Sequence, residues 1–400
     1  MTFTKEFSTS WGWLPRDLLD SILDNMITIS DYVRFSVVCK PWYSVAIHRP
    51  KHWRLNIIHD KVPLLMLPPN FPTSSSSPEG TRSLYRVTEN KVHNFKIPFS
   101  YNKRICGSSH GWLFTVEENM SLVLINPFSG GTIRLPPIRT IPDIEFEEVD
   151  GYEVVKASLT ADPILFPNDY TVVAICGGTN ILAYIKSGDQ SWSYVNTPYH
   201  HWLTDFVSYK GLIYAVDIWG VVLSFDISGV EDSHSSSPSS CIKEVAPSMS
   251  VMSDVTYIVE SSAGDLMLVQ RFVVPASYGD SHFLSSSFRI FKMQFGPNGD
   301  VVEMVELESL GGDALFLANN FSTAVLASDF VGCRSNSIYF SDHNYSMIEH
   351  SPYFLSHDFW IFNFGDCSIE ILCKLHPSPK HMVLGTWILS TLQGLPSSSE

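Results

Sequence analysis

The feature that most constrains the fold is a recurring unit, a tight turn followed by an apolar strand, spread over residues 85–392. The unit occurs as SSHGWLFTV at 108–116, SYKGLIYAV at 208–216, SSAGDLMLV at 261–269 and CRSNSIYFS at 333–341. Each stretch is followed by a second apolar stretch with the character of a strand, and no long helical periodicity interrupts them. This part of the chain is therefore predicted to be all-β.

One hairpin within this region can be assigned residue by residue. Phe291, Met293 and Phe295 alternate with polar residues, and the strand-like VVEMVELE at 301–308 follows after GPNGD. Alternation at period two is typical of a half-buried strand, and Asn298-Gly299 is a dipeptide preferred in two-residue hairpin turns. An antiparallel pair joined at this dipeptide is therefore predicted.

The length of the β region favours one all-β architecture over another. About 300 residues of hairpins is long for a single two-sheet sandwich, whereas four-stranded blades repeating at about 40–50 residues accommodate it well. We therefore predict a β-propeller of six blades, with seven as the next count and the sandwich as the alternative. The serine-rich run at 228–240 is predicted to be an inserted surface loop.

The N-terminal region has a different pattern, that of short amphipathic helices. A helix over Pro15–Met26 would carry all its apolar residues on one side, and further short helices are predicted over 31–37 and from Pro41 onward. Three short helices cannot bury so much apolar surface among themselves, because units of about 40 residues rarely build a sufficient core. The apolar stripe is therefore predicted to contact a partner, in this chain or in another protein. Its members are Leu18, Leu19, Ile22, Leu23 and Met26.

These patterns divide the chain into three parts. Residues 11–50 form the helical segment, residues 51–83 are rich in proline and serine and are predicted to be a connector, and residues 84–395 form the all-β domain.

Composition narrows the class of partner and the compartment. The 400 residues contain 26 Lys+Arg against 41 Asp+Glu, a formal net charge of −15, which argues against nucleic acid or an anionic membrane as a partner. No apolar run reaches the roughly 18 residues of a membrane span, and the N-terminus lacks the apolar stretch of a signal peptide. The seven scattered cysteines favour a reducing compartment, so we expect an intracellular protein of the nucleus or cytoplasm.

The sequence gives little support for catalysis or for a metal or other cofactor. We find no nucleophile elbow, no phosphate-binding glycine loop and no zinc-protease motif. Cys367, Cys373 and His376 lie close in sequence, but no C-x-x-C pair occurs anywhere. Asp217 and similar aspartates at strand ends are predicted to cap turns. We therefore expect a protein that is not an enzyme and that holds neither metal nor cofactor.

The helical segment resembles a known family of domains. LPRDLLDSIL at 14–23 and DYVRFSVVCKPWYSVA at 31–46 are similar to the F-box, which binds a Skp-type adaptor of SCF ubiquitin ligases. Carried over by position, the resemblance implies that Leu14 and Pro15 form the first contact with the adaptor. A second contact would come from the first helix. A third group of residues would hold the second and third helices together and complete the interface. The helical contact would come from Leu18, Ile22 and Leu23, and the third group would be Val38, Cys39 and Trp42.

The β region adds a second resemblance. SSHGWLF at 108–114, LINPFSGGTIRLPP at 124–137 and YIVESSAGDLMLVQRFV at 257–273 resemble plant F-box proteins with a KIB-type, kelch-like β-propeller. The similarity extends from Arg104 to Ile371 and departs at the tail around Trp387. It implies a β-propeller and does not identify a target.

Together, the two resemblances imply a substrate receptor of an SCF-type ubiquitin ligase. Its F-box would bind a Skp-type adaptor and through it a cullin, and its propeller would bind an unknown target protein. The alternatives are an adaptor-bound protein that inhibits its partner without ubiquitination, and a propeller enzyme. For the target site we predict Tyr199, His200 and Trp202 on the connector around His201, because aromatic side chains on loops suit binding hot spots. The competing interpretation is that Tyr199 and Trp202 fold inward and fill the space between blades.

Overall fold

The chain divides into two compact units, one within residues 1–61 and 390–400 and the other spanning residues 62–389. We describe each unit by itself, from a computed structural model. The residues that the structure describes are 14–24, 35, 38–47, 64–67, 81–87, 90–96, 105–127, 130–138, 154–176, 181–195, 201–227, 242–275, 283–318, 320–330, 332–341, 359–373 and 386–388.

The first unit is helical, as predicted. Helix α1 runs over Arg16–Asp24 and helix α3 over Lys40–Ile47. Helix α1 begins directly after Pro15, whose carbonyl accepts hydrogen bonds from the amides of Leu18 and Leu19 at 3.1 Å each. Phe35 is the described residue of the predicted middle helix; the rest of that helix and Met26 lie outside the described residues.

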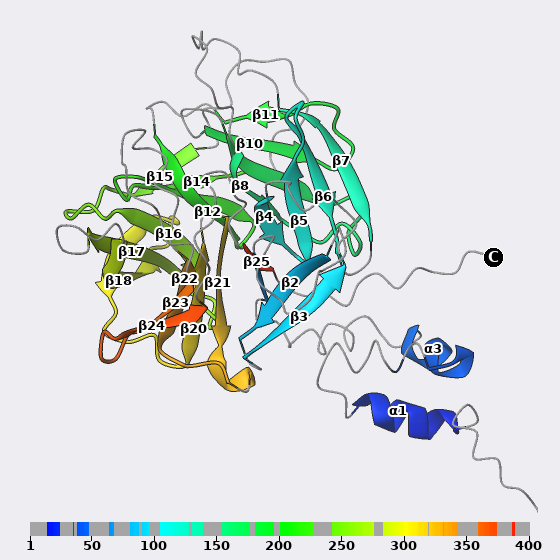
Figure 1. Cartoon of the computed structure of the whole chain (residues 1–400). Helices are drawn as coiled ribbons and strands as arrows, with labels where there is room; N and C mark the ends of the chain where they lie inside the picture. The colour runs from blue at the N-terminus through cyan, green and yellow to red at the C-terminus, as the bar shows by residue number, and fades with distance from the viewer. Residues whose placement is uncertain are drawn as a thin grey trace, which may run out of the picture. The chain divides into compact units, whose positions relative to one another are not determined.

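The described residues of the second unit form six sheets arranged around a common axis, which confirms a six-bladed propeller and excludes the sandwich (Figure 1). We number the blades by the chain order of their first strands. Blade 1 contains, from the axis outward, β25 (Thr386–Ile388), β1 (Leu64–Met66), β2 (Thr81–Arg86) and β3 (Lys91–Lys96). Blade 2 contains β4 (Ile105–Ser109), β5 (Trp112–Val116), β6 (Ser121–Ile125) and β7 (Thr132–Pro137).

The next three blades follow the same order, with the first strand nearest the axis. Blade 3 contains β8 (Val154–Leu159), β9 (Thr171–Cys176), β10 (Ile181–Lys186) and β11 (Ser193–Tyr194). Blade 4 contains β12 (Leu203–Tyr209), β13 (Leu212–Asp217), β14 (Val222–Phe225) and β15 (Ile242–Ala246). Blade 5 contains β16 (Val255–Glu260), β17 (Leu266–Pro275), β18 (Phe283–Phe295) and β19 (Val301–Glu306).

Blade 6 departs from this order. It contains, from one edge to the other, β21 (Phe321–Leu326), β20 (Asp313–Ala318), β22 (Ser337–Ser341), β23 (Phe359–Asn363) and β24 (Ile369–Cys373), and a 3-10 turn at Ala327–Asp329 follows β21. Strand β20 pairs with β22 in parallel, whereas the other pairs in the blade are antiparallel. The fourth turn–strand unit, at 333–341, therefore leads into the middle of its blade, whereas the other three form the hairpin between the first and second strands.

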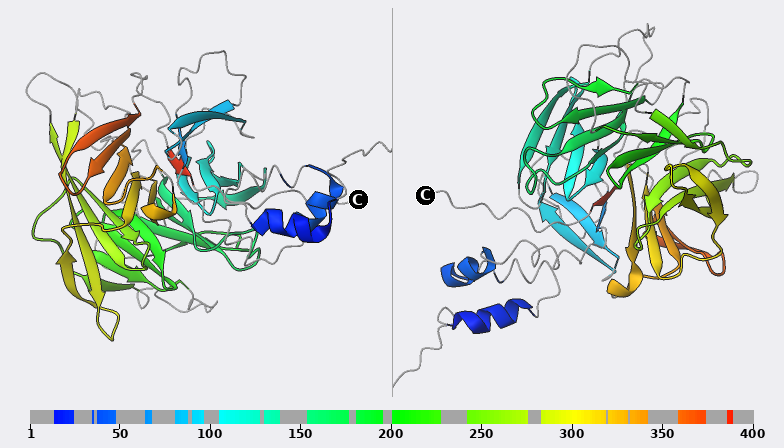
Figure 2. Two further views of the ribbon diagram at one scale, coloured as in Figure 1. Left: turned by 90° about the horizontal axis from the view of Figure 1, so that it is seen from below. Right: turned by 180° about the vertical axis from the view of Figure 1, so that it is seen from behind.

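The apolar core lies between the blades, so each blade packs face to face against its two neighbours (Figure 2). One buried cluster fills each junction around the ring. Leu64, Ile105 and Ile388, for example, belong to the cluster between blades 1 and 2. Burial on both faces explains why the inner strands β6 and β9 consist almost entirely of apolar residues.

Strands from opposite ends of the chain close the ring. Strand β1 pairs with β2 on one side and with β25 on the other, where Leu65 lies opposite Trp387. This arrangement corrects the predicted connector at 51–83, because Leu64–Met66 and the beginning of β2 belong to blade 1. The start of the propeller therefore lies about residue 62 rather than at 84.

The tight turns confirm the hairpins that the sequence predicted, but the turn of the β18–β19 hairpin is longer than predicted. His110-Gly111 and Lys210-Gly211 both have positive φ at each residue, as a two-residue turn between twisted strands requires. The β18–β19 hairpin is confirmed, with Met293 opposite Met304. Its turn is wider than the predicted two residues, because the Gly296 amide donates to the Asp300 carbonyl at 2.8 Å and Gly299, with φ of +77°, lies inside that loop.

Candidate functional site

The helical unit has its own small core, which takes up part of the predicted apolar stripe. Leu19 and Leu23 of α1 are buried against Phe35 and Trp42, whose ring centroids are 4.5 Å apart. The sequence assigned Leu23 to the adaptor contact, but its side chain is fully buried in this core. Trp42 of α3 packs in the same core, and the role of the third group in the adaptor interface stays a prediction.

Other members of the predicted contact set face outward. Leu18 is 49% exposed and Val38 is 50% exposed, and Pro15 is also exposed. Leu14, Ile22 and Cys39 are partly buried at the margin of the core. The residues of the predicted contact set that keep exposed area are therefore Pro15, Leu18 and Val38, together with the partly buried Leu14, Ile22 and Cys39, and we call these six residues the helical face.

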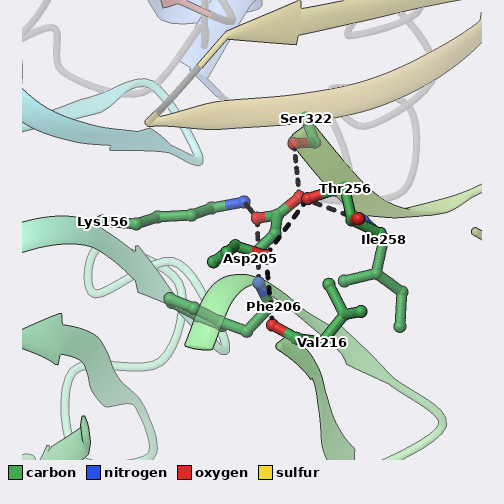
Figure 3. Close-up of polar contacts among 8 residues, drawn as sticks. Lys156, Asp205, Phe206, Val216, Thr256, Ile258 and Ser322 are labelled. Atoms are coloured by element: carbon green, nitrogen blue, oxygen red, sulfur yellow. Dashed lines mark hydrogen bonds and ion pairs between the residues drawn. The ribbon is translucent and has the colours of Figure 1, made fainter. Parts of the chain in front are cut away.

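In the propeller, a buried polar network ties four blades together near the axis (Figure 3). The ammonium group of Lys156 in β8 pairs with the carboxylate of Asp205 in β12, and both side chains are buried. The second oxygen of Asp205 accepts hydrogen bonds from the Ile258 amide of β16 at 3.0 Å and from the Ser322 hydroxyl of β21 at 2.9 Å. A charge-assisted network of this kind fixes the relative positions of the strands that contribute to it.

The network also shows that the inner strands begin at the same end of the propeller. Lys156 and Asp205 are the third residues of their strands, and Ser322 is the second of its own. The connectors that enter β8, β12 and β16 therefore lie at one end of the blades, which we call the entry end.

At the entry end, His201 and Trp202 precede β12 and are held by the turn between β13 and β14. The ring Nδ1 of His201 lies 2.8 Å from Oδ2 of the buried Asp217. The other oxygen of Asp217 accepts hydrogen bonds from the amides of Trp219 and Val221 at 2.9 Å each. The predicted turn-capping role of Asp217 is observed here, and the same carboxylate orients His201.

Trp202 is 39% exposed, so it does not fill the space between blades in the manner of the alternative interpretation. Tyr199 and His200, the other two predicted target-binding residues, lie outside the described residues.

Three further exposed apolar residues lie on two segments next to that of Trp202, and sequence reasoning missed them. Trp219 is 40% exposed, Val251 44% and Met252 61%. The Ile218 amide donates to the Trp202 carbonyl and the Met249 amide to the Trp219 carbonyl, at 3.1 Å each, so the three segments lie side by side. The signal for Trp219 was present in the sequence, because the residue lies inside the turn that Asp217 caps.

The described residues contain no group of three or more His, Cys, Asp or Glu placed to hold a metal ion. Two of the described thiols are also poor nucleophiles. Burial raises the pKa of Cys176 to about 12 and that of Cys333 to about 11, so both remain protonated near neutral pH. No helix in the described part of the chain has both the length and the hydropathy needed to cross a bilayer.

Comparison with known proteins assigns both units. The F-box domain model matches residues 11–54, and the KIB1-4 beta-propeller model matches residues 84–363. The two matches define an F-box protein with a β-propeller, a class whose members generally serve as adaptor-bound subunits without catalytic activity of their own. More narrowly, the chain belongs to the KIB1-4 β-propeller family of plant F-box proteins.

Relatives in Arabidopsis thaliana match this chain along most of their length. The F-box protein At2g26160 is 24% identical over 83% of this chain and 95% of its own, and the probable F-box protein At4g22165 is 25% identical over 96% and 97%. Among solved structures, one from the nidogen/laminin complex covers 82% of this chain and 97% of its own at 10% identity, with a TM-score of 0.43.

Proposed function

We propose that this protein is the substrate-recognition subunit of an SCF-type ubiquitin ligase. The helical unit binds a Skp-type adaptor and through it a cullin scaffold, and the propeller binds a target protein. Proximity is the only catalytic effect that the chain supplies, because it raises the effective concentration of the target at the ubiquitin-charged enzyme. The reaction takes place in the nucleus or the cytoplasm, where the scattered free cysteines are stable.

The main support is the exposure of the helical face in a unit that has already buried its own core. Leu18 and Val38 are about half exposed, although Leu19 of α1 and Trp42 of α3 are buried. Exposed apolar residues of this kind, on a helix that also carries the charged Arg16 and Asp20, are typical of a protein interface. Leu23 and Trp42 support the contact residues from inside the unit. The remaining apolar contacts come from Leu14, Pro15, Ile22 and Cys39.

The proposal is tested by purifying the full chain together with a Skp-type adaptor. Leu18→Asp with Val38→Asp is expected to abolish adaptor co-purification, because two charges would then face the apolar interface. Val302→Asp is the matched control, since Val302 is 67% exposed on β19 of the propeller. Adaptor binding that survives the double change contradicts the proposal.

A second measurement separates a ligase receptor from an inhibitor that only binds its partner. Partners captured with the wild-type chain in the presence of a proteasome inhibitor should carry ubiquitin chains. They should lose these chains, but remain bound, in the Leu18→Asp, Val38→Asp variant. Partners that are captured equally and never ubiquitinated favour the inhibitor.

A further inference from the structure

Blade 5 has a strand edge that the described part of the chain leaves uncovered, and the inference from this edge rests on the proposed function. Strands β17 and β18 are the longest among the described residues, and they stay paired as far as Pro275 and Phe283 (Figure 1). Strand β16 pairs with β17 only up to Arg271, and β19 pairs with β18 only from Phe291 on. The β17–β18 hairpin therefore extends past its neighbours at the entry end, as two strands with two edges.

The chain itself closes the edge of β17. The Val273 amide, which faces outward, donates a hydrogen bond to the Asp254 carboxylate at 2.7 Å. Pro275, at the end of the strand, has no amide hydrogen to present. This edge therefore offers few free donors to another strand.

The edge of β18 is open. Its last backbone partner is Leu307, whose amide donates to the Ile290 carbonyl at 2.8 Å and whose side chain packs against the apolar cluster between blades 5 and 6. The chain then turns away to blade 6, where the Leu310 amide donates to the Asn336 side chain at 2.7 Å. Toward the tip of the hairpin from Ile290, no strand of the described residues lies beside this edge.

Backbone groups of the open edge point outward at two residues. The Arg271 carbonyl faces β16 and accepts from the Asp254 amide at 3.0 Å, so Phe288, which lies opposite Arg271, directs its N–H and C=O away from β17. A bulge separates Phe288 from Ser285, which lies opposite Val273 and directs its N–H and C=O to the same side. A strand laid along this edge would find free donors and acceptors at both residues.

The open edge also lacks the features that keep strand edges from pairing. Elsewhere in the propeller, β7 ends in two prolines, β11 has two residues, and β3 begins and ends with lysine. Residues 283–288, FLSSSF, contain neither proline nor a charged residue. They give about 20 Å of strand, which suits one added segment. That length is small for pairing two copies of the chain, because stable dimers bury roughly 600–1,000 Å² on each partner.

We propose that β18 accepts an extended segment of the target protein as an additional antiparallel strand, in which apolar and polar side chains alternate. The target residue opposite Phe288 bonds to its backbone and lies on the same face as its ring. That face is apolar, because the buried Phe288 ring lies 5.2 Å from Phe340 and 5.0 Å from Phe362 between centroids. The alternate target residues lie on the face of Arg289, which Glu306 already pairs through two bonds of 2.6 Å, so uncharged polar side chains suit them.

The test uses the full chain and labelled peptides of alternating valine and threonine, flanked by lysine for solubility. The parent peptide should bind in fluorescence anisotropy. N-methylation of the valines, whose amides bond to β18, should weaken binding about tenfold or more, whereas equal N-methylation of the threonines should change it less than about twofold. No binding of the parent, equal loss in both analogues, or loss with the threonines alone overturns the proposal.

Two variants at one position locate the binding. Ser285→Pro removes an outward amide and places the proline ring against the added strand, so it should weaken binding about tenfold. Ser285→Ala keeps the amide and is the matched control. Both variants should keep the melting temperature, because an edge position tolerates proline. If Ser285→Pro does not fold, the methylated peptides still decide. Equal binding by the two folded variants refutes the assignment.

The peptide measurement needs neither adaptor nor ubiquitin, so the two proposals can fail separately. Adaptor binding and target ubiquitination without the difference between methylated valine and threonine would leave the receptor function standing and remove the added strand. The reverse result would remove the receptor function alone. A full chain that dimerises in sedimentation, and loses the dimer in Ser285→Pro, would show that a second copy occupies the edge and would overturn the proposal.

Discussion

The indole of Trp387 meets the ring of Phe316 edge to face, with the ring centroids 5.0 Å apart. Trp387 belongs to β25 of blade 1, whereas Phe316 belongs to β20 of blade 6, so this pair joins the last blade to the first. Phe359 contacts the same indole from β23, at 5.9 Å between centroids. The ring is therefore closed by side-chain packing as well as by the pairing of β25 with β1.

This closure predicts a large effect for Trp387→Ala. The side chain is fully buried among aromatic rings, and removing it leaves a cavity that should cost about 3–5 kcal/mol of unfolding free energy. The measurement is thermal unfolding followed by circular dichroism, where the melting temperature should fall by several degrees. Trp219→Ala, at a residue 40% exposed, should lose much less. Similar losses in both variants would show that Trp387 does not hold the ring closed.

The polar network at the axis predicts strong coupling between Lys156 and Asp205. Lys156→Met leaves a buried carboxylate without its cation, which should cost about 3–5 kcal/mol. Adding Asp205→Asn removes that uncompensated charge and keeps an oxygen for the Ile258 amide and the Ser322 hydroxyl. The double variant should therefore unfold at a higher denaturant concentration than Lys156→Met alone. Simple additivity of the two losses would argue against the network as drawn.

In the helical unit, substitutions at partly buried and at exposed positions should affect adaptor binding and helix stability differently. Leu14→Ala with Pro15→Ala should abolish co-purification of a Skp-type adaptor and leave the strand-dominated circular dichroism of the propeller unchanged. Leu14 is partly buried against the unit's own core, however, so this variant also weakens the helices. Leu18→Ser, at an exposed position, should weaken adaptor binding without changing the helical signal. Intact adaptor binding in both variants would count against the F-box contact.

Strand β1 predicts where the propeller can be cut. A fragment of residues 62–389 should fold alone with a strand-dominated spectrum, because it contains all six sheets. A fragment of residues 84–400, which the sequence favoured, lacks β1 and half of β2 and should be less stable or aggregate through the open edge of β25. Equal melting temperatures for the two fragments would mean that β1 contributes nothing to closure.

The thiols predict a pH dependence of chemical modification. The pKa of Cys176, raised to about 12 by burial, and that of Cys333, raised to about 11 mainly by burial, keep both thiols protonated at pH 8. Iodoacetamide should therefore modify the exposed Cys367 before Cys176 and Cys333, as followed by peptide mass spectrometry. Because the unfolded chain releases these protons at lower pH, stability should fall as the pH rises above about 9. Early modification of Cys176 in the folded protein would contradict its burial.

Much of the fold could be predicted because its signals are local. The alternation around Met293 and the turn at Gly299 lie within a few residues of each other, and they indicated the β18–β19 hairpin correctly. Strand β1 was missed for the opposite reason. Its three residues are too few to show a period, and its partner Trp387 lies more than 300 residues away in sequence.

The candidate site divides in the same way. Trp202 could be selected as an aromatic residue on a connector, but Trp219 and Met252 belong to other segments, which come beside that of Trp202 only in the fold. Lys156 is a charged residue in an otherwise apolar strand, which is a visible signal of a buried partner. The partner, Asp205, lies 49 residues away, and periodicity holds no information about such a pair.

The pairing of β1 with β25 also bears on how the chain folds during synthesis. Blades 2 to 5 consist of consecutive strands and can form one after another as the chain emerges. Blade 1 must wait, because its innermost strand ends at Ile388, and until then β1 presents an unpaired edge. Contacts of such long sequence separation form slowly, and open edges recruit other strands. The growing chain therefore depends on protection of Leu64–Met66 until nearly the whole sequence has been made.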